Sequence, residues 1–272
     1  MRRRATLWRV VIGAGLAGGL WIAAVAAFLT LADDVGLSPE RGVVVVYLVS
    51  FAVLIVGAGA AMRLLHDLPG SRLLGPGERV DAGPLLRGIL VVAAIAGALF
   101  LPMLLVEPPE RQQAVATWAL WLPAALPALF VQATAEEVVF RGYFQGMLAA
   151  RYASRLVWWV LPAAVFGLLH WNPQMGENAW VMVAAATLMG LALGDVAARS
   201  GGLSLPIGLH FANNVWAMLV MATPSQLSGL ALFVSPLDPD DPAAIRAALF
   251  GNMALIAVVW GVYIVIWRWR RR

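Results

Sequence analysis

The sequence predicts an all-α polytopic membrane protein, a bundle of about eight transmembrane helices. Its composition is the first reason, because 61% of the 272 residues are apolar and only 12% are charged. A soluble domain has about 45–50% apolar and about 25% charged residues. The second reason is the number of apolar residues, because 61% of 272 residues is about 166. Each membrane-spanning helix uses about 20 apolar residues, so the chain has enough for about eight such helices. A water-soluble enzyme is thereby excluded.

The apolar residues are grouped in eight stretches with short polar connections. These stretches cover residues 8–31, 43–65, 85–106, 114–130, 157–170, 180–198, 205–221 and 248–267. The first is longer than the apolar part of a secretory signal, about 7–15 residues, so we expect a retained helix. Two small-residue spacings, Gly15/Gly19 and Gly190/Gly194, suit close helix packing. We expect residues 1–272 to form a single integral membrane domain.

The charged residues predict the orientation of the helices. All 19 basic residues are arginine. If the N-terminus is inside and eight spans alternate, three arginines lie outside (Arg41, Arg111 and Arg246) and the other 16 lie inside. Because arginine-rich loops stay in the cytoplasm, we expect a cytoplasmic-membrane protein with both termini in the cytoplasm. Arginines at span ends favour contact with membrane lipids and disfavour nucleic acid as a partner.

Ionisable residues inside the apolar stretches are the best candidates for chemistry, because burying them in a membrane is costly. The strongest cluster is Glu136-Glu137-Val-Val-Phe-Arg141, near the inner end of the fourth stretch. Glu137 and Arg141 are four residues apart and can pair on one helix face. Glu136 lies about 100° around the helix from Glu137. The spacing therefore leaves Glu136 free to act as a general base.

Two of the three histidines also lie in apolar stretches. His170 follows Phe166 by four residues, and His210 precedes Asn214 by four, so each pair shares a helix face. An imidazole moves protons near neutral pH, and an amide can donate to an oxyanion. A carboxylate, two imidazoles and an amide together suit hydrolysis of an amide bond by an activated water. That water could equally sit on a divalent metal such as zinc, held by Glu136, His170 and His210.

Each residue also has an ordinary explanation when it is considered alone. A carboxylate or an arginine near a helix end usually reaches water. A single histidine or asparagine in a span often bonds to a neighbouring helix, and Phe166 fits a core position. His66, in an inner loop, is predicted to be solvated, and Asp195 is predicted to cap the inner end of its span. The absence of cysteine excludes a thiolate nucleophile.

The three motifs together resemble the CPBP family, which comprises CAAX prenyl proteases and bacteriocin-processing enzymes, also called Abi proteins. The motifs are EExxxR from Glu136, FxxxH ending at His170, and HxxxN from His210, and the resemblance covers about residues 114–222. It implies that Glu136 and His170 activate the water. It assigns the oxyanion, or metal ligation, to His210 and Asn214. Glu137 and Arg141 match the supporting pair, and family members are described both as metalloproteases and as metal-free glutamate proteases.

We therefore expect an intramembrane endopeptidase that cleaves peptide or membrane-protein substrates. The alternative is a non-enzymatic membrane protein: a proton- or metal-coupled transporter, or an immunity-type binding protein. One conflict remains. With regular spans, Glu136 lies near the inner side of the membrane and His170 near the outer side. Either Pro123 and Pro127 break or tilt the fourth helix, or the fifth span is shorter than a full crossing.

Overall fold

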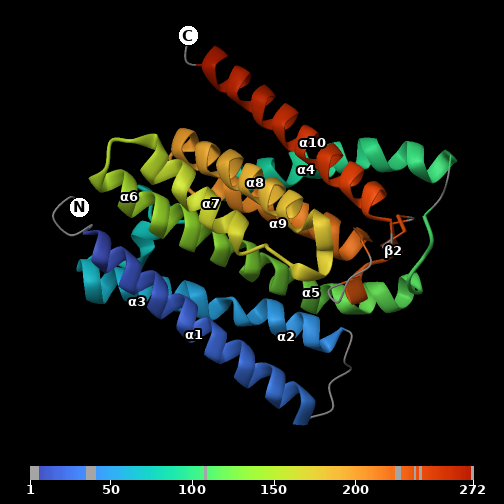
Figure 1. Ribbon diagram of the computed structural model, residues 1–272, viewed down its shortest axis with the longest axis horizontal. Helices are drawn as coiled ribbons and strands as arrows, with labels where there is room; N and C mark the ends of the chain where they lie inside the picture. The colour runs from blue at the N-terminus through green and yellow to red at the C-terminus, as the bar shows by residue number, and fades with distance from the viewer. Residues whose placement is uncertain are drawn as a thin grey trace.

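The computed structural model describes residues 6–34, 41–106, 109–223, 228–235, 237–238 and 241–270. Most of these residues are helical (Figure 1). The α-helices are α1 (Leu7–Asp34), α2 (Gly42–Ser50), α3 (Ala52–His66), α4 (Ala82–Val106), α5 (Val115–Glu137), α6 (Gly146–Arg151), α7 (Leu161–Leu168), α8 (Ala179–Ser200), α9 (Ser204–Val215) and α10 (Pro242–Trp269).

Shorter elements extend or connect these helices. Three have π geometry: η2 (Val138–Gln145), η3 (Leu156–Val160) and η5 (Trp216–Val220). Three are 3₁₀ turns: η1 (Gly70–Leu74), η4 (Pro173–Asn178) and η6 (Ser228–Leu230). The strands β1 (Met221–Ala222) and β2 (Phe233–Val234) pair in parallel, with Met221 opposite Phe233.

The predicted fold class is confirmed: the protein is an all-α, multi-pass membrane bundle. Within the described ranges, six helices are long and apolar enough to cross a membrane: Leu7–Leu31, Gly42–His66, Ala82–Leu105, Val115–Arg151, Pro173–Ser200 and Pro242–Trp269. The other two predicted stretches form shorter helices, Leu156–Leu168 and the pair α9–η5. All eight apolar stretches are therefore helical, but two are shorter than the rest.

The short fifth helix removes the conflict in depth between Glu136 and His170. The proline residues do not break α5, which continues through η2 and α6 as one helix of 37 residues ending at Arg151. Glu136 precedes Arg151 by 15 positions, and His170 follows Leu156, where the next helix begins, by 14 positions. At 1.5 Å per residue both lie about 21–23 Å from the turn between the two helices. The chain thus returns to the depth of Glu136 where His170 occurs.

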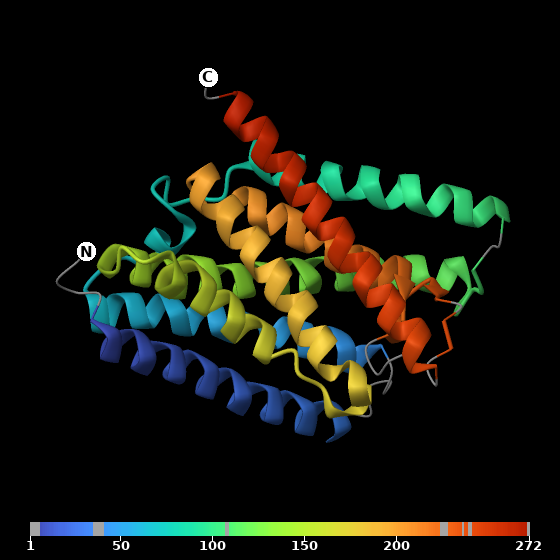
Figure 2. The same ribbon diagram turned by 45° about the horizontal axis from the view of Figure 1, so that its top comes forward.

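The interior of the bundle is formed by α5 with η2, together with α3, α7, α8 and α9 (Figures 1 and 2). Around η2 the buried side chains include Tyr143, Met147, Phe166 and Ile207. The outer helices α1 and α10 lie on opposite sides of this interior. Helix α10 has no buried residue and packs against α8 and η4. Exposed apolar side chains on such helices suit contact with lipid chains.

Helix α4 crosses α9 closely because glycine occurs on both helices. A Cβ atom added to Gly88 would lie 2.8 Å from the carbonyl oxygen of Leu205, and one added to Gly208 would meet the carbonyl oxygen of Leu85. Any side chain at these positions would force the helices apart. This crossing fixes α9, the helix that carries His210 and Asn214.

Candidate active site

Three helical segments carry the residues singled out from the sequence. Glu136 and Glu137 end α5, and Arg141 follows in η2. Phe166 lies in α7, with His170 just beyond its end. His210 and Asn214 lie on α9, one helical turn apart. The three segments meet in the interior of the bundle.

Glu137 is the buried centre of this cluster. Its side chain is fully buried, and its Oε1 atom accepts a hydrogen bond from Arg141 NH1 at 2.8 Å. The predicted pairing of Glu137 with Arg141 is therefore confirmed. The same oxygen also accepts from Nδ1 of His210 at 2.8 Å. Glu137 thus binds Arg141 on its own helix and His210 on α9 through Oε1, while its buried Oε2 atom has no hydrogen-bond partner among the described residues.

His210 lies between the two glutamates. Because Nδ1 donates to the buried Glu137 carboxylate, Nε2 is the nitrogen that faces Glu136, at 3.5 Å from its Oε2 atom. This distance is too long for a strong hydrogen bond. Two groups that can both accept a proton therefore face each other in the interior of the bundle. A water molecule or a substrate oxygen that bonds to both would complete the arrangement.

Gln132 is a further member of the cluster, which the three sequence motifs did not predict. Its Nε2 atom donates to Oε1 of Glu136 at 2.7 Å, and its Oε1 atom accepts from Nδ2 of Asn214 at 2.7 Å. Gln132 is 8% exposed. The signal was present in the sequence, because Gln132 is a polar residue in an apolar stretch and lies four positions before Glu136.

His170 reaches the cluster through Phe166. Its Nδ1 atom lies 2.8 Å from the carbonyl oxygen of Phe166, so Nδ1 carries the proton and Nε2 is the free nitrogen. The ring of Phe166 lies 4.6 Å from the His170 ring and 6.3 Å from the His210 ring, and the Arg141 guanidinium lies 4.8 Å from the same ring. In the described ranges no hydrogen bond or ion pair joins His170 to Glu136. His170 is exposed, which leaves its Nε2 accessible.

The described residues do not form a ready metal site. Among them, no group of three or more histidine, aspartate or glutamate side chains is arranged to hold a metal ion. Of the three predicted ligands, His170 contacts Phe166 rather than Glu136, whereas His210 keeps Nε2 toward Glu136 and donates from Nδ1 to Glu137, as metal-binding histidines commonly do. The expected divalent metal therefore stays a prediction.

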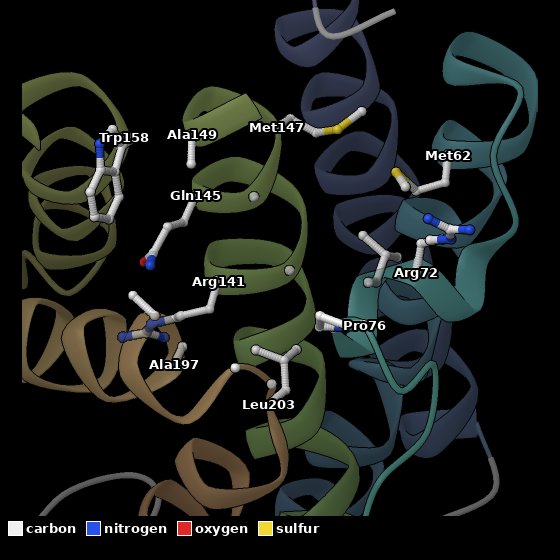
Figure 3. Close-up of a pocket in the computed structure, with 17 residues that line it drawn as sticks. Met62, Arg72, Pro76, Arg141, Gln145, Met147, Ala149, Trp158, Ala197 and Leu203 are labelled. Atoms are coloured by element: carbon white, nitrogen blue, oxygen red, sulfur yellow. The ribbon is translucent and has the colours of Figure 1, made fainter. Parts of the chain in front are cut away.

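A cavity of about 330 Å³ lies beside the cluster, and the two share Arg141. Figure 3 shows Arg141 and Gln145 on one side of it and Arg72 on another. Glu136, His170, His210 and Asn214 do not line it. Both arginines have a carboxylate partner, Glu137 for Arg141 and Glu78 for Arg72.

Two further ionisable residues lie away from the cluster. The prediction that His66 is solvated was wrong: it is fully buried, and its Nε2 lies 2.9 Å from the Tyr143 hydroxyl. His66 is the last residue of α3, and its ring packs against Tyr143 of η2. Its position next to a polar loop in the sequence does not indicate this contact between helices. Asp195 pairs with Arg199 at 2.6 Å and accepts from the Trp260 indole at 3.0 Å. Asp195 thus fixes α10 to α8.

Comparison with known proteins agrees with the three motifs. Residues 116–216 match the family described as "Type II CAAX prenyl endopeptidase Rce1-like". This match confirms the resemblance to the CAAX prenyl protease family, and it covers the segment that contains all three motifs. The chain is also 24% identical over 180 residues to the uncharacterized protein YyaK of Bacillus subtilis (strain 168). That alignment covers 64% of this chain and 60% of YyaK, so the chain spans less than two thirds of the relative. No solved structure matches.

Proposed function

We propose that this chain is an intramembrane endopeptidase that hydrolyses peptide bonds of membrane-associated substrates, with Glu136 as the base that activates water. The match of residues 116–216 to a CAAX prenyl endopeptidase family supports the reaction class. The observation that carries the assignment is the 3.5 Å approach of Glu136 Oε2 to His210 Nε2, inside a multi-pass helical bundle.

The different surroundings of the two glutamates support Glu136 as the base. Glu137 is neutralised by Arg141 and bonded to His210. The side chain of Glu136 is 12% exposed, and only its Oε1 atom has a hydrogen bond shorter than 3 Å among the described residues. Its Oε2 atom therefore faces the space beside His210 and can accept a proton from water.

His210 and Asn214 are suited to stabilise negative charge on the substrate. Since Nδ1 of His210 donates to Glu137, its Nε2 faces the site, and when Nε2 has taken up a proton its N–H can donate to an oxyanion. Asn214 lies one turn further along α9 and has a second amide hydrogen besides the one given to Gln132. Of these two groups, His210 Nε2 lies 3.5 Å from Glu136 Oε2, and Asn214 is joined to Glu136 through Gln132.

The proposed reaction has two steps. Water attacks the carbonyl carbon of the scissile peptide bond, and its proton passes to Glu136, which leaves an oxyanion beside His210 and Asn214. The carbon–nitrogen bond then breaks as Glu136 returns the proton to the leaving amine. The carboxylic acid product loses its own proton to water, and Glu136 is again ionised. His170, with its free Nε2, is proposed to help orient the attacking water.

The membrane placement is part of the proposal. We propose that the protein lies in the cytoplasmic membrane with both termini inside, which puts 15 of its 19 arginines on the cytoplasmic side, while Arg141 is buried inside the bundle. Helix α1 begins and α10 ends toward the same end of the bundle, which supports an even number of crossings (Figure 1). A substrate peptide could then approach the site from the lipid, with or without a prenyl group.

The test compares purified parent protein, Glu136→Gln and Glu177→Gln in detergent micelles. Glu177 is an exposed glutamate of η4 that pairs with Arg246, so Glu177→Gln is the matched control. The probes are two internally quenched peptides of one sequence, with and without a farnesyl group on a cysteine four residues from the C-terminus. A positioned base is worth about 10²–10⁴-fold, so Glu136→Gln should lower kcat/KM at least about 100-fold while Glu177→Gln retains the parent rate.

Two outcomes would contradict the proposal. Equal cleavage by the parent and Glu136→Gln would remove Glu136 from the mechanism. If the parent cleaves neither peptide but carries protons or divalent cations into liposomes, the transporter alternative holds. Repeating the cleavage assay with a chelator, and then with added zinc, tests the predicted metal. A rate lost with chelator and restored by zinc would show metal dependence.

A further inference from the structure

We propose that Gln132 is a positioning residue that fixes the Glu136 carboxylate and the Asn214 amide in one arrangement. This inference rests on the proposed function and deepens it. Gln132 lies one turn before Glu136 on α5 and is 8% exposed. Its side chain uses both ends, donating to Glu136 at 2.7 Å and accepting from Asn214 at 2.7 Å. It thus joins the proposed base on α5 to the proposed oxyanion donor on α9.

Gln132 is the main determinant of how Glu136 is oriented. Among the described residues it gives Glu136 its only side-chain hydrogen bond shorter than 3 Å, because His210 lies 3.5 Å away. The bond holds Oε1 of Glu136 and leaves Oε2 to face His210. Without Gln132, rotation of the carboxylate would exchange the two oxygens and remove a fixed position for the water.

The direction of the hydrogen bonds also orients Asn214. An ionised carboxylate only accepts, so Gln132 must turn its NH₂ group to Glu136 and its oxygen to Asn214. Asn214 must then present its own NH₂ group to Gln132, and its Oδ1 atom accepts from Asn213 Nδ2 at 3.3 Å. The second hydrogen of that NH₂ group remains for an oxyanion. Glu136 and Gln132 together therefore decide which end of the Asn214 amide faces the site.

Gln145 provides a matched control. It is also a buried glutamine of the long helix Val115–Arg151, and its Nε2 donates to the carbonyl oxygen of Gly194 on α8 at 2.8 Å. Gln132 and Gln145 thus both join this helix to a neighbour, but among the described residues no hydrogen bond joins Gln145 to Glu136, His170, His210 or Asn214. Replacing either by methionine keeps the length of the side chain and removes the hydrogen bonds.

The experiment measures kcat and KM for the two quenched peptides with Gln132→Met, Gln132→Asn and Gln145→Met. A small misplacement of a reacting group costs up to about 100-fold in rate. We expect kcat to fall about 10–100-fold for both Gln132 variants, with KM within about twofold of the parent. Asparagine should fail because it is one methylene too short to reach both partners. Gln145→Met should keep kcat within about twofold, even where its melting temperature falls.

A second comparison separates positioning from a general loss of structure. Because Gln132 is proposed to act through Glu136 and Asn214 together, Gln132→Met should cause no further loss of kcat in a Glu136→Gln/Asn214→Ala background, whereas a structural defect would add to it. An unchanged kcat in Gln132→Met, or equal losses in Gln132→Met and Gln145→Met, would overturn the inference.

The inference and the proposed function can fail separately. If the parent cleaves the peptides and Gln132→Met is unimpaired, only the role of Gln132 is wrong. If the parent cleaves neither peptide, the proposed function is contradicted. The role of Gln132 is then decided by an experimental structure of Gln132→Asn, in which unchanged positions of Glu136 and Asn214 would overturn it. If Gln132→Met does not fold, Gln132→Asn replaces it in the kinetic comparison.

Discussion

Replacing Glu137 by alanine should lower the melting temperature of the protein, because two buried groups depend on this carboxylate. The side chains of Glu137 and Arg141 are 0% and 2% exposed, and His210 Nδ1 donates to the same oxygen. Glu137→Ala leaves the Arg141 guanidinium with the Phe166 ring and a long 3.5 Å contact to the carbonyl oxygen of Gly190. His210 loses the acceptor for its Nδ1–H.

The size of the effect follows from these contacts. Removing one partner of a buried ion pair costs about 3–5 kcal/mol, and leaving a buried hydrogen-bond donor without a partner costs about 1–3 kcal/mol. A domain of this size melts about 2–4 °C lower per kcal/mol. Loss of the Glu137–Arg141 pair alone therefore predicts a fall of roughly 6–20 °C.

The assay is thermal unfolding of purified variants in detergent micelles, with a double variant and a matched pair. Glu137→Ala/Arg141→Met removes both charges and should recover most of the loss, because only the His210 donor then lacks a partner. Asp195–Arg199 has the same i,i+4 spacing, but its side chains are 14% and 18% exposed. Asp195→Asn should therefore lower the melting temperature by less than about 4 °C.

The reasoning would be refuted if Glu137→Ala melted within about 2 °C of the parent. It would also be refuted if the double variant were less stable than the single one, because the cost would then not come from an uncompensated Arg141. Expression level alone does not decide the matter, so the measurement is made on protein that elutes as a single species.

Three further predictions concern packing and charge. Phe166→Ala should lower kcat about 10–100-fold with a smaller effect on KM, since both imidazoles lose the ring that places them; an unchanged rate in the quenched-peptide assay would contradict this. Gly208→Val should destabilise the protein by about 1–3 kcal/mol in thermal unfolding, because the new side chain would meet the Leu85 backbone. A melting temperature equal to that of the parent would contradict the close crossing of α4 and α9. A hydrogen bond from Ser71 lowers the pKa of Glu78 in the loop before α4. The stabilisation that ionised Glu78 gives the protein is therefore present above the ordinary carboxyl pKa and is lost as the pH falls through the lowered value. Glu78→Gln should melt at a lower temperature than the parent at pH 7, and the difference in melting temperature should disappear in acid.

The local arrangement of the site was predictable because the period of a helix fixes which residues of one segment share a face. The spacing of Glu137 and Arg141 predicts their ion pair, and the structure contains it. The same rule could have found Gln132, four positions before Glu136. A glutamine carries no charge, however, so it was not among the ionisable residues selected as candidates. Composition alone identified a membrane protein, since so many apolar residues have no place in a soluble domain.

Relations between helices were not predictable in the same way. The glycine spacings look alike in the sequence, yet a Cβ atom on Gly190 or Gly194 would lie within 3.0 Å of an atom of another helix, while one on Gly15 or Gly19 meets nothing within 4 Å. Periodicity states which residues share a face but not what that face contacts. The burial of His66 escaped prediction for the same reason.

The sequence by itself determined the membrane class, the eight apolar helices, the three motifs and the family they resemble, because each depends on composition or on spacing within one segment. Only the tertiary structure decided that the helix after Arg151 is short enough to return His170 to the depth of Glu136. It also decided that His210 lies between two glutamates and that Gln132 joins α5 to α9. Depth and contact between helices depend on where the chain turns and how side chains pack across the bundle, and no spacing within a single helix contains that information.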